Sequence, residues 1–215
     1  MNKLISVAID SPAAAGAGTQ AKLIAKHYNL FYLDTGKIYR FIGYLKIKHK
    51  KKFSYSLVKK KINKLKIKEL QKKKLLSNKV AIEASIVAKD KKIRKIVHNF
   101  QKKCAYKPPK NFNGSILDGR DITSVIMKDA MFKFFITASV KIRAKRRYKE
   151  LRSLNIKIPY NDVLKSIKKR DKNDYTRKIS PLKKTKDSTL INTTNLTKRS
   201  CFLKIKQIID KKLNY

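Results

Sequence analysis

Two patterns of hydrophobic and polar positions alternate along the chain. Short runs rich in β-branched and aromatic residues predict strands, and the first run, Leu4–Asp10, has no charge until its last residue, which is typical of a strand buried in a parallel sheet. The other predicted strands are Phe31–Leu33, Ser115–Leu117, Phe132–Thr137 and Thr189–Asn192. Apolar residues at helical spacing predict helices at Thr19–Tyr28, Ile38–Ile47, Val80–Lys103, Val140–Ser153, Asp162–Lys169 and Leu203–Leu213. Strands that alternate with helices predict an α/β fold, in which helices cover both faces of a central parallel sheet.

The segment Lys48–Asn78 differs from the rest because it is rich in lysine. Its apolar residues, among them Leu57, Val58 and Ile62, predict one or two amphipathic helices that form a small cap. A partly mobile basic segment is the alternative.

The chain of 215 residues carries 56 Lys and Arg against 14 Asp and Glu, a formal net charge of +42, and 42% of its residues are hydrophobic. These values fit one folded domain with room for a small inserted subdomain. The charge is typical of proteins that bind nucleic acid, and it favours nonspecific affinity for such polyanions. The basic residues are, however, 46 Lys and only 10 Arg in a chain also rich in Ile and Asn, which indicates a compositional bias. Arginine is then the more informative residue, because its planar fork is kept where geometry requires it.

Several classes of protein are excluded by what the sequence lacks. The apolar run at the start is too short for a membrane span or a signal peptide. Cys104 and Cys201 are isolated, which indicates a reduced protein without structural zinc. His27, His49 and His98 are scattered, which argues against a histidine metal site. We therefore expect a cytoplasmic protein.

A loop of small residues lies between the first predicted strand and the first predicted helix. Backbone N–H groups and a helix N-terminus hold phosphate in loops of this kind. The usual pattern, G-x-x-x-x-G-K-[ST], is met in part: Gly16 matches, Ser11 replaces the first Gly and Ala17 replaces the Lys. The candidate residues for binding nucleotide phosphates are Ser11, Pro12, Ala13, Ala14, Ala15, Gly16, Ala17, Gly18 and Thr19. A tight strand-to-helix turn without a ligand is the alternative.

Four further motifs follow the loop. They are Leu33–Arg40 (LDTGKIYR), Leu117–Asp121 (LDGRD), Arg143–Arg147 (RAKRR) and Arg170–Arg177 (RDKNDYTR), the last followed by Ser180-Pro181-Leu182. In this order, the loop and the motifs resemble those of bacterial cytidylate kinases, a family of nucleoside monophosphate kinases. The resemblance runs from about residue 4 to the C-terminal helix.

The resemblance implies a three-layer phosphate-loop kinase fold. Its core would be residues 1–40 and 104–215, with a helical monophosphate-binding insert at about 41–103 and a lid at about 143–178. The implied reaction transfers the γ-phosphoryl group of ATP, which is bound with Mg²⁺ by the loop residues above, to CMP or dCMP. The products would be ADP and CDP or dCDP, and the protein would be a monomer without a stable protein partner. Because the stretch Arg40–Val80 is shorter than the family's insert, we expect part of the monophosphate lid to be reduced to helices.

The resemblance also implies roles for individual residues. CMP would be held by Thr35, Tyr39, Arg40, Ser85, Arg94, Arg120, Asp121, Asp174 and Arg177. Catalytic roles at the transferring phosphoryl group would fall to Arg143, Arg147 and Arg170, with Arg146 beside them on the lid. Magnesium would take Thr19 directly or through water, and Asp118 through water. Asp10 and Asp34 could equally be structural, as caps of turns.

The placement of arginine agrees with these roles. Eight of the ten Arg lie in or beside the motifs, in a chain that uses Lys almost everywhere else. A phosphate dianion is best held by bidentate guanidinium groups, whereas a solvated surface accepts either cation. The clustering of Arg therefore predicts a phosphate-transfer site.

The main departure from the family pattern is Ala17, which removes the Lys that bridges the β- and γ-phosphates. Losing such a cation costs orders of magnitude in rate unless another group replaces it. Lys22, one turn further along the helix, and the lid arginines are the candidates, and a solvated surface position is the alternative for Lys22. Ala17 and the +42 charge also leave open a degenerate kinase fold that binds nucleotide or RNA without catalysis.

Overall fold

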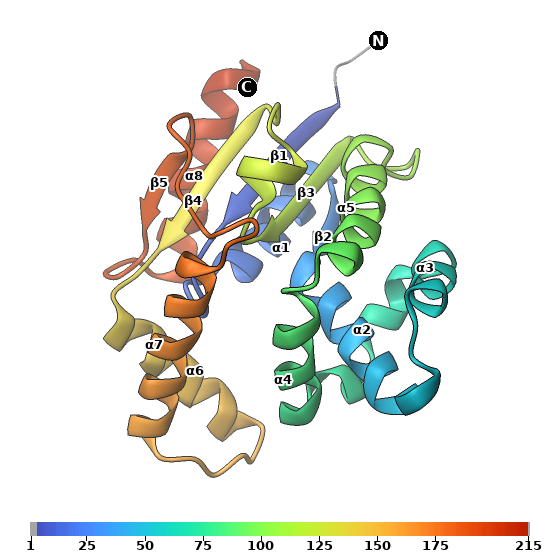
Figure 1. Cartoon of the computed structure of the whole chain (residues 1–215). Coiled ribbons are helices and arrows are strands. Elements are labelled where there is room, and N and C mark those ends of the chain that lie inside the picture. Colours follow the sequence, from blue (N-terminus) through green and yellow to red (C-terminus); the bar gives the residue numbers. More distant parts are fainter. Residues whose placement is uncertain (1–3, 215) are drawn as a thin grey trace.

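The computed structural model describes residues 4–214, and its centre is a five-stranded parallel sheet with helices on both faces (Figure 1). The strand order is β2-β3-β1-β4-β5, which confirms the predicted α/β fold. The strands are β1 (Ile5–Asp10), β2 (Phe31–Asp34), β3 (Gly114–Gly119), β4 (Phe132–Thr137) and β5 (Thr189–Asn192). All five were predicted, with ends that differ by at most two residues.

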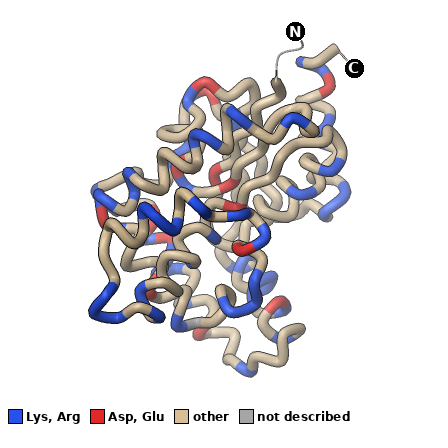
Figure 2. The backbone as a smooth tube through the Cα atoms, turned by 90° about the vertical axis from the view of Figure 1, so that its right-hand side faces the viewer, with Lys and Arg blue, Asp and Glu red and all other residues tan. Residues whose placement is uncertain are grey.

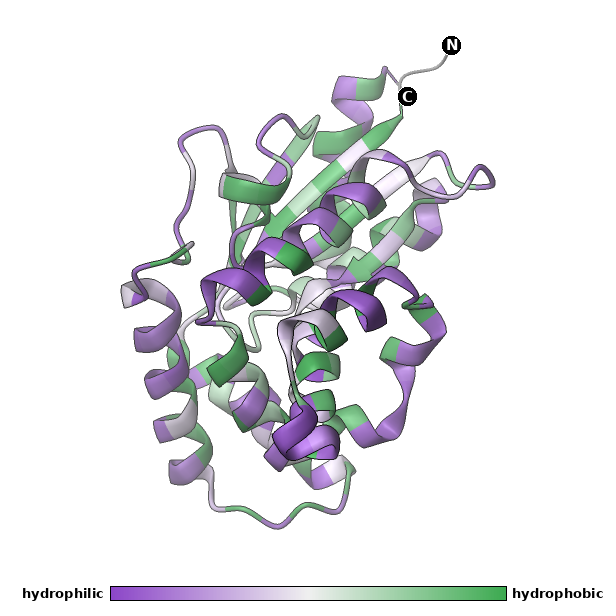
Figure 3. Ribbon diagram, turned by 45° about the vertical axis from the view of Figure 1, so that its right-hand side comes forward, coloured by the Kyte–Doolittle hydropathy of each residue, from purple (hydrophilic) through white to green (hydrophobic). Residues whose placement is uncertain are grey.

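Successive residues of the central strands face opposite sides of the sheet and build two separate cores. Val7, Ile9 and Ile116 pack with α1 (Ala17–Tyr28) and α8 (Lys198–Leu213). On the other face, Ala8 and Leu117 pack with α2 (Thr35–His49) and α5 (Lys91–Tyr106). Figure 3 shows that hydrophobic residues concentrate in the strands, while the outer faces of the helices are hydrophilic. The sheet is thus buried on both faces, as its continuous apolar strands predicted.

The lysine-rich segment is largely helical. It contains α3 (Tyr55–Asn63) and the 3₁₀ turns η1 (Lys50–Lys52), η2 (Ile67–Gln71) and η3 (Lys73–Leu76). Val58, Ile62 and Leu75 are buried in the core beside α2. The predicted amphipathic cap is confirmed for this segment.

The predicted single helix Val80–Lys103 is wrong, because two helices occupy this stretch. They are α4 (Asn78–Val87) and α5, and the side chain of Asp90 begins α5 by accepting a hydrogen bond from the backbone N–H of Ile93 at 2.9 Å. An N-cap of this kind satisfies a helix N-terminus without a Gly or Pro, and the apolar spacing continues across it.

Two helices form a pair that projects from the sheet (Figure 1): α6 (Val140–Ser153) and α7 (Tyr160–Thr176). Val163 and Ile167 of α7 pack against Ala13 of the first loop, with α6 residues around them. The helix α7 is longer than the predicted Asp162–Lys169, and a one-turn π-helix at Ile122–Ile126 was not predicted.

Lys and Arg are spread along most of the chain in the view of Figure 2, rather than gathered on one element. Within residues 4–214, no helix is both long enough and apolar enough to span a bilayer.

Candidate active site

The loop after β1 brings the first candidate residues to the carboxyl end of the sheet. The backbone N–H of Ser11 donates to Gly119 O at 3.2 Å, which fixes the loop beside β3. Ala14 and Gly16 have positive φ angles of 60° and 96°, which turn the backbone into α1. Gln20 N–H then closes the first helical turn on Gly16 O at 3.0 Å. A turned loop ahead of a helix N-terminus is the geometry that binds phosphate.

Ala17 is the first residue of α1, two residues before the predicted start of the helix. Its side chain is only 5% exposed and belongs to the core formed with α8. Lys22, the first candidate for a replacement cation, is exposed on α1, and the structure gives it no partner among the described residues. Position 17 therefore places no lysine beside this loop.

Asp10 and Asp34 both have structural partners. Asp10 is fully buried and accepts hydrogen bonds from the backbone N–H of Ile122 at 2.8 Å and from the N–H and hydroxyl of Thr123 at 2.8 and 2.6 Å. Burial raises the pKa of Asp10 to about 6, although these hydrogen bonds oppose the shift. Asp34 begins α2 by accepting from the backbone N–H of Lys37 at 3.3 Å.

Asp118 lies at the end of β3, where Asp34 is its register partner on β2. Burial, and then the charge of Asp34, raise the pKa of Asp118 to about 7. Its side chain accepts a hydrogen bond from the hydroxyl of Tyr32 at 3.0 Å, and its backbone oxygen accepts one from Thr35 Oγ1 at 2.7 Å. A Cβ added at Gly18 would lie 3.5 Å from Asp118 Oδ2, so this carboxylate faces the start of α1.

These groups fit magnesium that arrives with a nucleotide rather than a metal held by the protein alone. Thr19 is exposed on the first turn of α1, next to the Gly18 position that Asp118 faces. A divalent cation would relieve the repulsion between the neighbouring carboxylates of Asp34 and Asp118. No group of three His, Cys, Asp or Glu side chains in residues 4–214 forms a metal cluster, so most ligands would be phosphate oxygens and water.

A buried charged cluster forms between α5, the end of β3 and the end of α7. Arg94 and Asp121 are 2% and 5% exposed, and Nη2 of Arg94 pairs with Oδ2 of Asp121. Arg177 Nη2 lies 4.0 Å from Oδ1 of Asp121, and the guanidinium of Arg94 lies 5.6 Å from the centre of the Tyr39 ring. Burial alone raises the pKa of Asp121, but the hydrogen bond from His98 and the charges of Arg94 and Arg177 lower it overall.

Several buried polar atoms of this cluster lack a hydrogen-bond partner. They are the hydroxyl of Tyr39, Nε of Arg94 and Nη2 of Arg177. Buried polar groups are nearly always paired in folded proteins, so three unpaired donors in one place call for a polar ligand. This cluster is the clearest sign of a binding site in the described residues.

A second ion-pair group adjoins it. Arg120 Nε donates to Asp174 Oδ2 at 2.8 Å, and Asp174 also lies 3.7 Å from Arg177 Nη1. Arg170 Nε lies 4.0 Å from the same carboxylate. Arg177 thus stands between Asp121 and Asp174 and joins the two groups into one site.

Four arginines repel one another in this site. The pKa of Arg170 is lowered to about 10, first by burial and then by the charges of Arg120, Arg40 and Arg147. The pKa of Arg40 is likewise lowered, by burial and by the charge of Arg147. The Arg170 side chain is nevertheless 57% exposed, so water reaches its guanidinium. Guanidinium groups held together at this density attract an anion of high charge.

The arginines named in the sequence therefore divide into two sets. Arg40, Arg94, Arg120, Arg147, Arg170 and Arg177 converge on one site. Arg143, by contrast, is 6% exposed and pairs with Asp171 through both terminal nitrogens, at 3.0 and 2.6 Å. Arg146 donates to the carbonyl and hydroxyl oxygens of Thr193, at 2.7 and 2.9 Å. Arg143 and Arg146 thus bind groups of the protein itself rather than face a space that a ligand could fill.

Ser85 is the candidate that the structure leaves apart. It is exposed on α4, and its hydroxyl donates to Ile82 O of the same helix at 2.7 Å. Arg40 is tied to the same part of the molecule, since its Nη1 donates to Leu75 O at 3.0 Å.

Sequence reasoning missed two residues of the site. His98 Nε2 lies 3.4 Å from both Asp121 Oδ2 and Arg94 Nη2. Its position four residues after Arg94 on a predicted helix was the available signal, because such residues share a face. Asp171, the partner of Arg143, lay inside a quoted motif but had no assigned role.

Comparison with known proteins identifies the family of the chain. A family model described as cytidylate kinase matches residues 7–211. The cytidylate kinase of Clostridium tetani (strain Massachusetts / E88) is 40% identical and covers 96% of this chain and 94% of its own. The cytidylate kinases of Clostridium botulinum (strain Okra / Type B1) and Bartonella tribocorum are each 38% identical, and cover 98% and 91% of this chain and 96% and 90% of their own.

A solved structure shows the same fold. It is a crystal structure of an uncharacterized protein from Eubacterium ventriosum, with a TM-score of 0.56 and 20% identity, which covers 96% of this chain and 98% of its own. The family match spans nearly the whole chain and includes the turned loop and the arginine-rich site. The chain belongs to the cytidylate kinase family.

Proposed function

We propose that the protein transfers the γ-phosphoryl group of ATP to CMP or dCMP and releases ADP with CDP or dCDP. The observation that carries this proposal is the group of unpaired buried donors on Tyr39, Arg94 and Arg177 beside the cluster of arginines around Arg170. The unpaired donors fit a nucleoside, and the arginines fit the phosphates of the donor and the acceptor in a phosphoryl transfer.

We assign the acceptor nucleotide to the buried cluster. Oδ1 of Asp121 is an acceptor, and Nη2 of Arg177, 4.0 Å away, is a donor without a partner. A cytosine edge presents an amino donor next to a ring-nitrogen acceptor, which is the complement of this pair. Uracil presents a carbonyl where cytosine has its amino group, and a carboxylate repels it. The pocket therefore favours CMP over UMP.

The acceptor phosphate and the transferring group are assigned to Arg40, Arg120, Arg147 and Arg170. Their mutual repulsion is relieved when phosphate oxygens enter between them. Phosphoryl transfer needs alignment and charge neutralisation more than covalent chemistry, so no nucleophilic side chain or general base is required. These four arginines supply the charge that Ala17 does not.

The donor nucleotide is assigned to the turned loop, residues 11–19, whose N–H groups would hold its phosphates. Magnesium bound there would bridge the ATP phosphates and neutralise their charge, with Thr19 and water-linked Asp118 as the protein ligands. Arg143 and Arg146 hold the loop and the lid together rather than touch the transferring group.

The structural division follows from these assignments. The core is residues 1–40 and 104–215, the insert that carries Arg40's partner Leu75 is about 41–103, and the lid that carries Arg147 and Arg170 is about 143–178. Because the arginines assigned to the phosphates lie both on the lid and outside it, binding of the nucleotides would favour closure of the lid.

A coupled assay with ATP and Mg²⁺ tests the proposal. The purified protein should phosphorylate CMP and dCMP faster than UMP or AMP. Arg170→Ala should lower kcat by roughly a hundredfold, whereas Arg152→Ala, which changes an exposed arginine of α6 outside the site, should not. Absence of turnover with all four monophosphates at high enzyme concentration would refute the kinase. RNA binding that falls steeply with salt and resists ATP and CMP would then mark a degenerate fold.

A further inference from the structure

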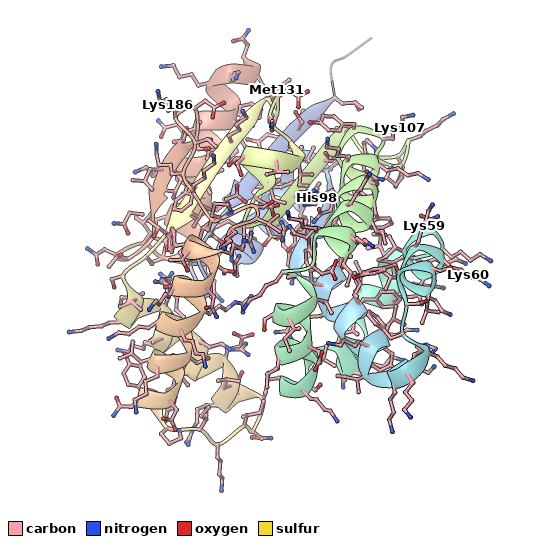
Figure 4. The ribbon with its side chains drawn as sticks, in the orientation of Figure 1. Lys59, Lys60, His98, Lys107, Met131 and Lys186 are labelled. Atoms are coloured by element: carbon pink, nitrogen blue, oxygen red, sulfur yellow. The ribbon has the colours of Figure 1, made fainter. Side chains whose placement is uncertain are left out.

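His98 is a side chain of the nucleotide pocket that the family motifs do not include. It lies on α5, one turn after Arg94, and Figure 4 shows it on the side of that helix that faces the middle of the molecule. Its side chain is 19% exposed, and Nε2 lies 3.4 Å from Oδ2 of Asp121. The distance to Nη2 of Arg94 is also 3.4 Å.

The chemistry of the three groups allows two arrangements of the hydrogen bonds, which differ in the tautomer of His98. An ionised carboxylate only accepts, and a guanidinium only donates. Arg94 already donates to Oδ2 of Asp121, so a proton on Nε2 of His98 gives that oxygen a second donor. With the proton on Nδ1 instead, Nε2 would accept a hydrogen bond from Nη2 of Arg94, and Oδ2 would keep Arg94 as its donor without His98.

Two donors on one oxygen hold the carboxylate against rotation. Oδ1 of Asp121 then points away from them, with Nη2 of Arg177 as its neighbour at 4.0 Å. The described residues give Oδ1 no hydrogen bond. A partial rotation of the carboxylate would change the direction in which Oδ1 accepts, whereas a half-turn would only exchange two equivalent oxygens.

We propose that His98 is a positioning residue for base selection: its Nε2–H holds Asp121 so that Oδ1 stays free to accept a hydrogen bond from the amino group of cytosine. This inference rests on the proposed function, because it takes Asp121 as a contact of the nucleotide base. His98 itself does not touch the substrate.

Three substitutions separate the hydrogen bond from the space that the ring fills. The amide nitrogen of Gln can reach the position of Nε2, whereas that of Asn reaches only the position of Nδ1. His98→Leu and His98→Asn should raise KM for CMP and lower the preference for CMP over UMP by roughly tenfold each, the effect of one lost hydrogen bond to a charged group. His98→Gln should stay within about threefold of the wild type. KM for ATP and kcat should not change, since the loop assigned to ATP and the arginines assigned to the phosphates are untouched.

A cycle with Asp121→Ala tests whether His98 acts through Asp121. In that background, His98→Leu should have no further effect on KM for CMP. Equal KM values and equal base preference for the Gln, Asn and wild-type proteins would overturn the proposal, as would an additive effect in the cycle. If His98→Leu does not fold, the comparison of Gln with Asn still decides. A wild-type protein that phosphorylates no monophosphate refutes the proposed function instead, while active wild type with indifferent His98 variants refutes only this role.

Discussion

Arg143 donates hydrogen bonds to Asp171 from both terminal nitrogens, at 3.0 and 2.6 Å, and thereby joins α6 to α7. The same guanidinium donates to Ala13 O at 3.1 Å and to Ala138 O at 2.9 Å. One side chain thus ties the lid helices to the phosphate loop. Arg147, four residues later, pairs with Glu150 alone among residues 4–214 and remains 35% exposed.

We predict that Arg143 contributes to stability and Arg147 to catalysis. Arg143→Ala leaves a buried carboxylate unpaired and should lower the free energy of unfolding by about 3 kcal/mol. Arg147→Ala should leave stability within about 0.5 kcal/mol, because the residue is on the surface, but should lower kcat by roughly a hundredfold. Urea denaturation and the CMP assay measure the two effects. Equal stability loss in both variants would contradict the division.

Restoring the missing lysine tests whether the arginines replace it. Ala17→Lys should raise kcat/KM by less than about tenfold, because four guanidinium groups already neutralise the phosphates. Ala17→Met adds comparable bulk without charge and controls for crowding, since Ala17 is buried in the core beside α8. A gain of several orders of magnitude in Ala17→Lys alone would show that nothing compensates for the lysine.

Two buried carboxylates should make stability fall with pH. The pKa of Asp10 is raised to about 6 and that of Asp118 to about 7, in both cases first by burial. The value in an unfolded chain is about 3.9, so the folded protein binds more protons between about pH 4 and 7. The free energy of unfolding therefore decreases as the pH rises through that window.

Asp118→Asn is the variant to compare with the wild type, because it removes one of the two titrating carboxylates. Urea denaturation from pH 5 to pH 8 should show a shallower decrease in Asp118→Asn than in the wild type. Parallel curves for the two proteins would mean that Asp118 titrates in its ordinary range.

The contact between α2 and α4 should tolerate no side chain at Gly43. A Cβ there would lie 2.7 Å from the backbone nitrogen of Ala84 and 3.0 Å from the oxygen of Val80. Gly43→Ala should therefore lower the free energy of unfolding by about 2 kcal/mol, because α4 must move. Gly36→Ala, in the same helix, meets only the Asp34 carboxylate at 3.3 Å and should not destabilise to that extent. Equal thermal denaturation of the two variants would contradict the tight packing.

Much of the fold was predictable because its signals are local. The strands β4 and β5 and the helix α6 have the predicted ends, where apolar runs meet polar or turn residues. The break between α4 and α5 was missed because its signal is a single Asp cap within a continuous helical pattern.

The site was predictable only as far as motifs name residue types. Arg143 and Arg147 could not be told apart, because the difference lies in Asp171 on another helix, which packing brings to one of them. His98 was missed because its partner Asp121 lies 23 residues away and meets it only after β3 joins the sheet. Long-range pairings of this kind are set by tertiary structure, which short patterns do not contain.

Asp10 connects the two sites that the proposed reaction requires. It is the last residue of β1, directly before the phosphate loop, and it holds the backbone of Ile122 and Thr123, directly after Asp121. One buried carboxylate thus links the loop assigned to ATP with the residue assigned to the acceptor base. In the proposed function, this link would hold the donor and acceptor sites at a constant separation.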